Sequence, residues 1–314
     1  MTRIVTLTLN PAVDLACLAD GVVSTHKIRT FDEHIDPGGG GINVARVLKA
    51  LGADVRAIVL AGGVTGALIE EMLTDAGVPH ETIHCRGRSR ISFTVFDRTT
   101  KQEYRFVPLG PTAEPCDWDH VLTAIDETPC DWLVGSGSLE PGMPPDFYAT
   151  IAKLARERGS RFAVDTSGAA LRAVLDSGVD IAKPSLSELE AYVGRALPTA
   201  AEQDAEARAL VRSGHAGMVA VTLGDEGAVL ATEDQVLRMP AIPVPFQGAV
   251  GAGDSFMAGL IWGLARGLSH REALGWAVAS GSAAVARTGT ARVRFEDVVE
   301  WHAKLPVRRT DVVV

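Results

Sequence analysis

Hydrophobic and polar residues are arranged in blocks that predict strands followed by helices over most of the chain. Short apolar runs such as "IVTLTL", "VRAIVLAG" and "RFAVDTSG" have the length and content of buried strands. Between them, "GINVARVLKALGA", "GALIEEMLTDAGV" and "PDFYATIAKLARERG" repeat apolar residues at helical spacing. Buried strands that alternate with amphipathic helices indicate a mostly parallel sheet covered on both faces. The pattern therefore predicts an α/β fold.

Two segments, residues 12–35 and 88–107, depart from this alternation. In the second, "RISFTVFD" and "KQEYRFVP" predict a hairpin around "RTTK". We expect both segments to form a small β-sheet lid beside the main sheet. Since no proline- or serine-rich linker and no internal repeat divides the chain, residues 1–314 are predicted to form a single domain that carries this lid. From Gly251 onward the pattern becomes mainly helical.

Composition and charge narrow the classes of partner. With 46% hydrophobic and 22% charged residues among 314, the chain can bury a full core. The net charge of −9 argues against a broad basic face for nucleic acid, although a local basic cluster could still bind a phosphorylated metabolite. The four cysteines lack any paired spacing that would suggest disulfides or a zinc site. The start "MTRIVTLTLNP" has no leader-like pattern and no apolar run reaches membrane-spanning length, so we expect a cytoplasmic protein without a membrane partner.

Two glycine clusters carry the candidate chemistry, and each precedes a predicted helix. In "DPGGGGINVARVLKALG", four glycines allow close approach of a ligand to the backbone, and Asn43 offers an amide to hydroxyl groups. In "VGAGDSF", the N–H groups of Ala252, Gly253 and Asp254 can converge at the positive end of a helix and hold a transferred phosphoryl group. The carboxylate of Asp254 can then accept the proton of the attacking hydroxyl. The alternative is a tight turn with Asp254 as an ordinary helix cap.

Other motifs are incomplete. The chain has no G-x-x-x-x-G-K-[ST] sequence, and "GAGDSF" has Phe256 where a dinucleotide-binding motif needs its third glycine. The run "HETIH" at 80–84 matches the H-E-x-x-H pattern of zinc proteases, which requires a helix. Pro79 and Gly87 leave too little room for that helix, and the β-branched Thr82 and Ile83 favour a strand. We therefore expect neither a P-loop, a dinucleotide site nor a metalloprotease.

Taken in order, the motifs "GGGGIN" and "VGAGDSF" resemble the paired signatures of the PfkB group of ribokinase-like carbohydrate kinases, and the resemblance extends from "TLTLNPAVD" to "GSAAVARTGT". Within that group, "DPGGGGINVAR", "QEYRFVPLGP" and "VDTSGAAL" are similar to segments of bacterial 6-phosphofructokinases of the minor-isozyme type. The resemblance implies a ribokinase-like three-layer α/β/α sandwich whose β lid often forms a dimer contact, hence a homodimer. It also implies ATP-dependent phosphorylation of fructose 6-phosphate at its 1-hydroxyl, which yields fructose 1,6-bisphosphate and ADP.

The same resemblance assigns the catalytic and sugar-binding positions. Asp254 matches the family's catalytic base, and the amides of Gly251, Ala252, Gly253 and Asp254 match its anion hole. The positions that match sugar-phosphate contacts are Asp14, Gly39, Gly40, Asn43, Arg90, Ser138 and Lys27. These residue types suit their roles, because carboxylates and amides recognise hydroxyls and a guanidinium recognises a phosphate ester. Asp14 could instead cap a turn after Pro11, Arg90 could be a solvated charge, and Lys27 could be a mobile surface lysine.

For the nucleotide, "TLGDEGAVL" at 222–230 resembles the family's strand and turn along ATP, and "KPSLSEL" at 183–189 resembles its K-P-N-x-x-E-L segment. The positions assigned to the cofactor are Lys183, Ser185, Thr222, Gly224, Gly227 and Ser282. Glu188 matches the acidic position associated with Mg²⁺, whereas Ser185 replaces the usual asparagine. Mg²⁺ is expected because it neutralises phosphate charge. K⁺ often binds beside the anion hole in this family, but Gly248 replaces a common polar residue and leaves only backbone carbonyls there.

Two function classes follow from these observations. A sugar-phosphate kinase accounts for Asp254 and both glycine clusters, whereas a non-catalytic nucleotide or sugar-phosphate binding protein on the same scaffold has no need of a base. Among kinases, tagatose 6-phosphate kinase and 1-phosphofructokinase are the alternatives, since their families share most of these motifs. Those relatives more often carry a lysine at the position of Gly40, which favours fructose 6-phosphate as the substrate here.

Overall fold

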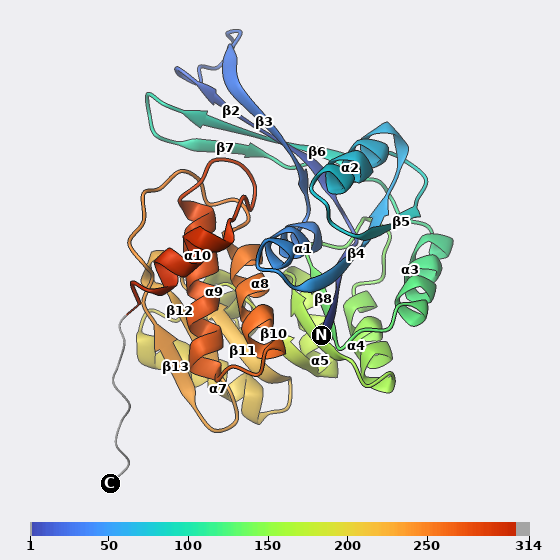
Figure 1. Cartoon of the computed structure of the whole chain (residues 1–314), viewed down its shortest axis with the longest axis vertical. Helices are drawn as coiled ribbons and strands as arrows, with labels where there is room; N and C mark the ends of the chain where they lie inside the picture. The colour runs from blue at the N-terminus through green and yellow to red at the C-terminus, as the bar shows by residue number, and fades with distance from the viewer. Residues whose placement is uncertain (1, 306–314) are drawn as a thin grey trace.

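The computed structural model describes residues 2–305, and its centre is a nine-stranded sheet (Figure 1). The strand order is β13-β12-β11-β10-β9-β8-β1-β4-β5. In chain order the strands are β1 (Arg3–Thr8), β4 (Asp54–Ala61), β5 (His80–His84), β8 (Trp132–Ser136), β9 (Arg161–Asp165), β10 (Val179–Ala182), β11 (Ala216–Thr222), β12 (Ala228–Ala231) and β13 (Val236–Met239). All pairings from β5 to β11 are parallel, while β12 and β13 pair antiparallel at one edge. The mostly parallel sheet predicted from the sequence is confirmed.

Helices cover both faces of this sheet, and each face has its own hydrophobic core. One core packs under α1 (Gly40–Ala50), α2 (Gly63–Asp75), α8 (Ala252–Ala265), α9 (His270–Val285) and α10 (Phe295–His302). The other packs under α3 (Pro115–Glu127), α4 (Phe147–Glu157), α5 (Gly168–Ser177), α6 (Leu186–Val193) and α7 (Ala200–Arg212). Strand β4 supplies both cores alternately, with Val59 in the first and Leu60 in the second, because successive strand residues point to opposite faces.

A second sheet of four strands stands beside the main one and projects at the top of Figure 1. Its order is β3 (Thr30–Gly38), β2 (Ala12–Ala19), β6 (Arg90–Asp97) and β7 (Glu103–Phe106). β6 and β7 pair antiparallel, as expected for the hairpin around "RTTK". Residues 9–11 link the carboxyl end of β1 directly to β2, and β3 leads straight into α1. The second sheet therefore stands over the carboxyl edge of the main sheet, where ligands bind in open α/β folds.

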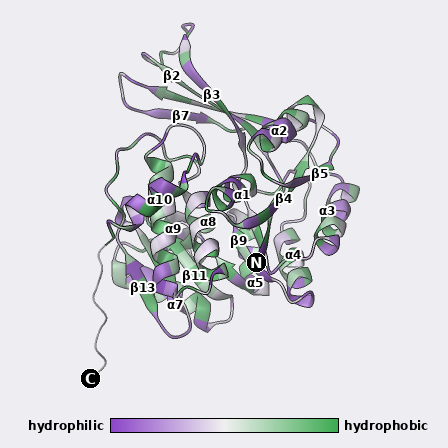
Figure 2. Cartoon of the chain, in the orientation of Figure 1, coloured by the Kyte–Doolittle hydropathy of each residue, from purple (hydrophilic) through white to green (hydrophobic). Residues whose placement is uncertain are grey.

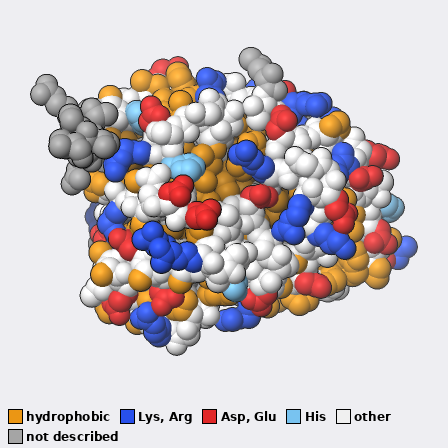
Figure 3. Space-filling model, turned by 90° about the horizontal axis from the view of Figure 1, so that it is seen from below, with side chains coloured by type: hydrophobic (Ala, Val, Ile, Leu, Met, Phe, Trp, Pro, Cys, Tyr) orange, Lys and Arg blue, Asp and Glu red, His pale blue; other side chains and the backbone are white. Residues whose placement is uncertain are grey.

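The structure tests one of the rejected motifs directly. The run "HETIH" is strand β5 and not a helix, as its β-branched residues predicted. Hydrophilic residues lie along the outer helices α3 and α7 (Figure 2). Acidic and basic side chains are interspersed over the face shown in Figure 3. Among residues 2–305, no helix has the length and apolar content needed to cross a bilayer, and the four cysteines are free thiols.

Candidate active site

Asp254 lies in the first turn of α8 and is held by two side chains from distant parts of the chain. Asn43 Nδ2, from the first turns of α1, donates to Asp254 Oδ2 at 2.9 Å. Ser136 Oγ, from the last residue of β8, donates to Asp254 Oδ1 at 3.0 Å. Burial raises the pKa of Asp254, and these two hydrogen bonds oppose the rise because they stabilise the ionised carboxylate. The result is an oriented carboxylate that is more basic than one in water.

The turn before α8 presents backbone donors beside this carboxylate. Gly251 is the N-cap residue with φ of 80°, a left-handed conformation that favours glycine, and a Cβ there would lie 2.8 Å from Ala291. The amide of Ala252 donates to the carbonyl of Ala249 at 3.2 Å, whereas the amides of Gly253 and Asp254 have no backbone acceptor within residues 2–305. A pair of such amides at a helix N-terminus is suited to bind an anion, and we refer to these two amides as the anion cradle.

The first glycine cluster fits tightly against the ends of β1 and β8. A Cβ on Gly40 would lie 2.2 Å from Ser136 Oγ, and one on Gly41 would lie 2.2 Å from the carbonyl oxygen of Leu7. Gly39 has φ of 114°, and a Cβ there would lie 2.6 Å from the Thr8 side chain. The glycines are therefore required for α1 to approach the sheet closely enough that Asn43 reaches Asp254.

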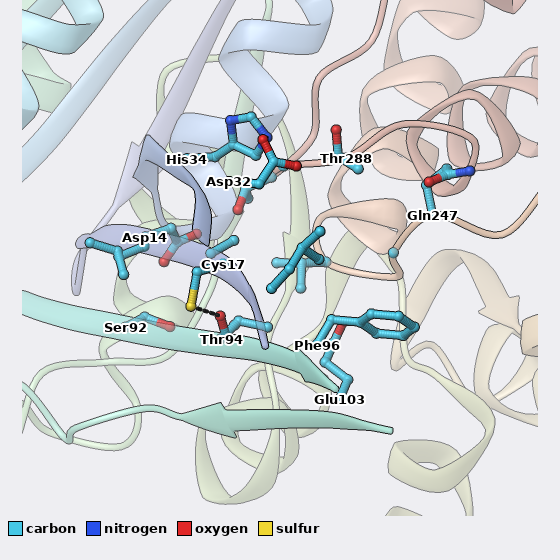
Figure 4. Close-up of a pocket in the computed structure, with 17 residues that line it drawn as sticks. Asp14, Cys17, Asp32, His34, Ser92, Thr94, Phe96, Glu103, Gln247 and Thr288 are labelled. Atoms are coloured by element: carbon cyan, nitrogen blue, oxygen red, sulfur yellow. Dashed lines mark hydrogen bonds and ion pairs between the residues drawn. The ribbon is translucent and has the colours of Figure 1, made fainter. Parts of the chain in front are cut away.

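Asp14 lines a cleft between the second sheet and the loops that flank α8 and α9, as Figure 4 shows. On the opposite side of this cleft lie Gln247 and Thr288. A Cβ on Gly38 would lie 2.3 Å from the Asp14 carboxylate, so the glycine makes room for it. Burial raises the pKa of Asp14, while a hydrogen bond from Thr290 and the charges of nearby arginines lower it. Asp14 is thus a partly buried carboxylate that faces the cleft.

The ammonium group of Lys183, which follows β10, lies next to the anion cradle. Its Nζ lies 3.1 Å from Asp165 Oδ2, its side chain is only 4% exposed, and a Cβ on Gly253 would be 3.5 Å from Nζ. Desolvation lowers the pKa of Lys183, but the charges of Asp165, Glu188 and Asp254 outweigh it and leave the pKa raised. Lys183 is therefore a fixed ammonium ion beside the two free amides.

The segments assigned to the nucleotide lie side by side at the carboxyl ends of β10 and β11. Ser185 and Thr222 form an isolated parallel β-bridge, and the amide of Thr222 donates to the carbonyl of Pro184 at 3.1 Å. Ser185 and Glu188 form a capping box for α6, with Ser185 N donating to Glu188 Oε2 at 2.8 Å. Part of the Glu188 carboxylate therefore already has a structural role.

The remaining positions assigned to the nucleotide lie in the turn after β11 and on α9. Gly224 begins the 3₁₀ helix η1 (Gly224–Glu226) with φ of 62°. Gly227 has φ of 106° and leaves no space for a Cβ, which would lie 2.1 Å from the carbonyl oxygen of Met239. Ser282 is buried on α9, and its neighbour Gly281 lies against the start of α8, where a Cβ on Gly281 would be 3.3 Å from the carbonyl oxygen of Ala252.

Arg90 and Ser138 meet at Asn10, beside the cleft. Arg90 begins β6, and its Nη1 and Nη2 donate to the carbonyls of Pro108 at 3.0 Å and Asn10 at 2.9 Å. Its Nε is buried without a partner. Asn10 Nδ2 lies 3.3 Å from Ser138 Oγ. Lys27 is not brought to this group, because it is exposed in the connection between β2 and β3, at the projecting end of the second sheet.

Four residues that the sequence did not single out also lie at the candidate site. Ser136 orients Asp254, Asp165 pairs with Lys183, and Thr290 lies close enough to lower the pKa of Asp14. Arg105, on β7, lies close enough for its charge to lower the pKa values of both Asp14 and Asp254. Asp165 and Ser136 end adjacent strands β9 and β8, and polar residues at the carboxyl ends of predicted parallel strands were the signal that could have revealed them.

Comparisons with known proteins identify the family and the fold of the chain. The family model for pfkB family carbohydrate kinases matches residues 6–296. The chain is 40% identical over 312 residues to ATP-dependent 6-phosphofructokinase isozyme 2 of Mycobacterium tuberculosis, covering 99% of this chain and 91% of that protein. It is 35% identical over 310 residues to a 1-phosphofructokinase of Haloferax volcanii, covering 98% and 99%. A crystal structure of Escherichia coli phosphofructokinase-2 in complex with substrates and products superimposes with a TM-score of 0.93 at 35% identity, covering 97% and 99%.

The family resemblance inferred from the two glycine signatures is thereby confirmed, and so is the ribokinase-like fold with helices on both faces of one large sheet. The match spans nearly all of the described chain and includes both glycine clusters and Asp254. The protein belongs to the pfkB family of carbohydrate kinases.

Proposed function

We propose that this protein transfers the γ-phosphoryl group of ATP to the 1-hydroxyl of fructose 6-phosphate. The observation that carries the proposal is Asp254, a carboxylate fixed by Asn43 and Ser136 beside two unpaired amides at the start of α8. A base and an anion cradle in one helical turn are what phosphoryl transfer to a hydroxyl requires. The relatives at 35–40% identity named as phosphofructokinases support the same reaction class.

In this mechanism Asp254 accepts the proton of the attacking hydroxyl. Its raised pKa makes it a better base than a solvated aspartate, and the two donated hydrogen bonds oppose the rise because they stabilise the ionised form. Asn43 and Ser136 also fix the direction of the carboxylate oxygens. The amides of Gly253 and Asp254, together with the ammonium of Lys183, stabilise the charge on the transferred group.

The sugar phosphate would lie in the cleft between the second sheet and the loops that flank α8 and α9, which Asp14 lines. Asp14 and Asn43 suit hydroxyl groups, and Arg90 and Arg105 supply positive charge from β6 and β7 on the same side. Both terminal nitrogens of Arg90 already bond carbonyls, so a phosphate would be bound by its remaining donors and charge rather than by a free fork. Ser138 and the backbone of Gly39 and Gly40 complete the proposed sugar contacts.

ATP would extend from the cradle along Lys183, Ser185 and the turn after β11. Within residues 2–305, no three His, Cys, Asp or Glu side chains are grouped as a metal-binding set. These described residues therefore offer no ready-made metal cage, and Mg²⁺ fits best as an ion carried by the nucleotide phosphates with Glu188 and Asp165 nearby. It would supply charge neutralisation. K⁺ would have to rely on backbone carbonyls near Gly248.

We also propose a homodimer formed through the second sheet. Its strands expose Ile35 (49%), Ile91 (50%) and Phe106 (58%), which is unusual for the strands of a monomer. A second copy would cover this apolar surface. Sedimentation of the Ile91→Asp variant should show a monomer where the unmodified protein is a dimer, and an unchanged mass would contradict this interface.

The substrate is tested by ADP release over a panel of fructose 6-phosphate, tagatose 6-phosphate, fructose 1-phosphate and fructose, each with ATP and Mg²⁺. We expect the highest kcat/KM for fructose 6-phosphate. A preference for fructose 1-phosphate would support 1-phosphofructokinase, the activity named for the Haloferax volcanii relative. No turnover with any sugar, despite ATP binding, would favour a binding protein on this scaffold. Because ATP and sugar phosphates are substrates found in the cytoplasm, we also propose that the enzyme acts there.

A further inference from the structure

A groove lined by four arginines lies outside the catalytic cleft. It has a volume of about 440 Å³ and is bounded by Asp36 on β3, Arg46 on α1, Val78 after α2, and the segment 287–294 between α9 and α10. Residues 288–290 of that segment line the catalytic cleft instead, and the groove and the cleft share no lining residue. The groove is therefore a separate hollow on the other side of this segment.

Two of these arginines, Arg292 and Arg287, are held through Nε by acidic side chains, which leaves their terminal nitrogens available to a ligand in the groove that both residues line. Arg292 uses Nε for both oxygens of Asp36, at 2.9 and 3.1 Å, and Arg287 uses Nε for Asp297 at 2.5 Å. Neither residue has a partner for Nη1 or Nη2 within residues 2–305, and their side chains are 39% and 31% exposed. A guanidinium fixed through Nε has its two terminal groups oriented and free to bind an oxyanion.

The charges in the groove are unbalanced. Four guanidinium groups, of Arg46, Arg287, Arg292 and Arg294, meet two carboxylates, of Asp36 and Asp297. Arg294 is exposed and has no ion-pair partner among the described residues. The protein as a whole carries a net charge of −9, so this local excess of positive charge is opposite in sign to the surrounding molecule. Such a reversal is expected where a small anion binds.

We propose that this groove is a second anion site that binds a phosphate-bearing metabolite. Its volume exceeds that of one phosphate group and lies in the range of small-molecule sites. The oxyanion receives hydrogen bonds from the terminal nitrogens of Arg287 and Arg292 and from Arg294, while Asp36 keeps its own bonds to Arg292 Nε and Arg46 Nη2. Binding thus adds to the existing network and breaks none of it.

Asp36 and the segment it contacts link the groove to both glycine clusters through direct packing and hydrogen bonds. Asp36 precedes Pro37 and the first glycine cluster, and it accepts the amide of Thr290 at 3.1 Å. In the segment 287–294, Ala291 packs on Gly251 in the second glycine cluster. An anion that fixes Arg292 therefore stabilises the segment against which the anion cradle packs, which makes this an effector site rather than a second catalytic site.

Calorimetric titration with inorganic pyrophosphate tests the proposal in the full chain. Arg294→Glu is compared with Arg271→Glu, an equal charge change at an exposed residue at the opposite end of α9. Pyrophosphate that enters the catalytic cleft contributes equally to both variants. Apart from any binding in the cleft, we expect one binding event in the unmodified protein and in Arg271→Glu that is weakened at least about tenfold in Arg294→Glu and in Arg287→Gln.

Two results would overturn the proposal. If Arg294→Glu and Arg271→Glu bind pyrophosphate alike, with affinities equal to that of the unmodified protein, all binding lies in the cleft. If both variants weaken binding equally, the effect is one of overall charge and not of a site. Circular dichroism of Arg294→Glu should match the unmodified protein, because the side chain is exposed and holds no partner. Arg287→Gln then serves as the second, independent variant.

Discussion

Replacing Asp254 by asparagine should separate catalysis from folding. Asparagine has the same shape, and its Oδ1 can accept from Asn43 while its Nδ2 donates to the Ser136 hydroxyl, so both hydrogen bonds survive. The amide cannot accept a proton at neutral pH. We therefore expect kcat to fall about 10²–10⁴-fold with the affinity for ATP nearly unchanged, which corresponds to about 3–5 kcal/mol of activation free energy.

The same substitution should not reduce stability. Burial raises the pKa of Asp254, so the folded protein binds its proton more tightly than the unfolded chain does. Stability contributed by the protonated carboxyl is therefore present at low pH and is lost as pH rises through the folded-state pKa. At pH 7.5 asparagine removes a buried charge, and the melting temperature of Asp254→Asn should equal or exceed that of the unmodified protein.

Initial rates of ADP release between pH 5 and 9, with thermal denaturation of the same samples, check both expectations. In the unmodified enzyme kcat/KM should fall on the acidic side as Asp254 becomes protonated. Ser136→Ala is the matched control, because it keeps the carboxylate but removes one donor, and it should move this acidic limb to higher pH. An Asp254→Asn enzyme that keeps more than about a tenth of its activity would refute the role of Asp254 as base.

Three further predictions follow from the site. Gly253→Val places a branched side chain between the free amides and Lys183 Nζ, so turnover should be lost in a protein whose circular dichroism is unchanged; a folded, active variant would count against the cradle. Arg90→Ala should raise KM for fructose 6-phosphate about 10–100-fold and leave KM for ATP within a few-fold, whereas equal changes in both would remove Arg90 from the sugar site. Glu140 is 2% exposed, neither of its oxygens has a hydrogen-bond partner, and burial raises its pKa to about 8. Since the unfolded carboxyl titrates near 4.5, stability should fall as pH rises from about 5 to 8, and Glu140→Gln should raise the melting temperature at pH 8.5 but not at pH 5; equal melting curves at both would contradict this.

Local patterns predicted some parts of the site well. The strand at 80–84, the hairpin of β6 and β7 and the helices that follow both glycine clusters depend on residue spacing and turn chemistry within a few positions. Gly251 illustrates why: its φ of 80° is a local requirement that only a glycine meets easily, so the sequence marks the turn directly. Asp254 could be singled out because it follows that turn at once.

Other roles could not be read from the chain. Ser136 and Asp165 end the strands β8 and β9, but their roles depend on distant partners, because Ser136 bonds Asp254 on α8 and Asp165 pairs with Lys183 after β10. Arg90 was expected to bind the sugar phosphate with a free guanidinium, yet its terminal nitrogens bond carbonyls contributed by Pro108 and Asn10. Glu188 looked like an ion ligand, but it also caps α6.

The sequence by itself determined the α/β class, the two glycine cradles and the family to which they belong, because periodicity, turns and helix starts arise from interactions between near neighbours. Only the tertiary structure decided which side chains meet. Asn43 and Asp254 are separated by 211 positions, and the arginine groove combines β3, α1 and the segment after α9. Such contacts follow from the order of strands and the packing of helices on the sheet, which depend on the whole chain and not on any local pattern.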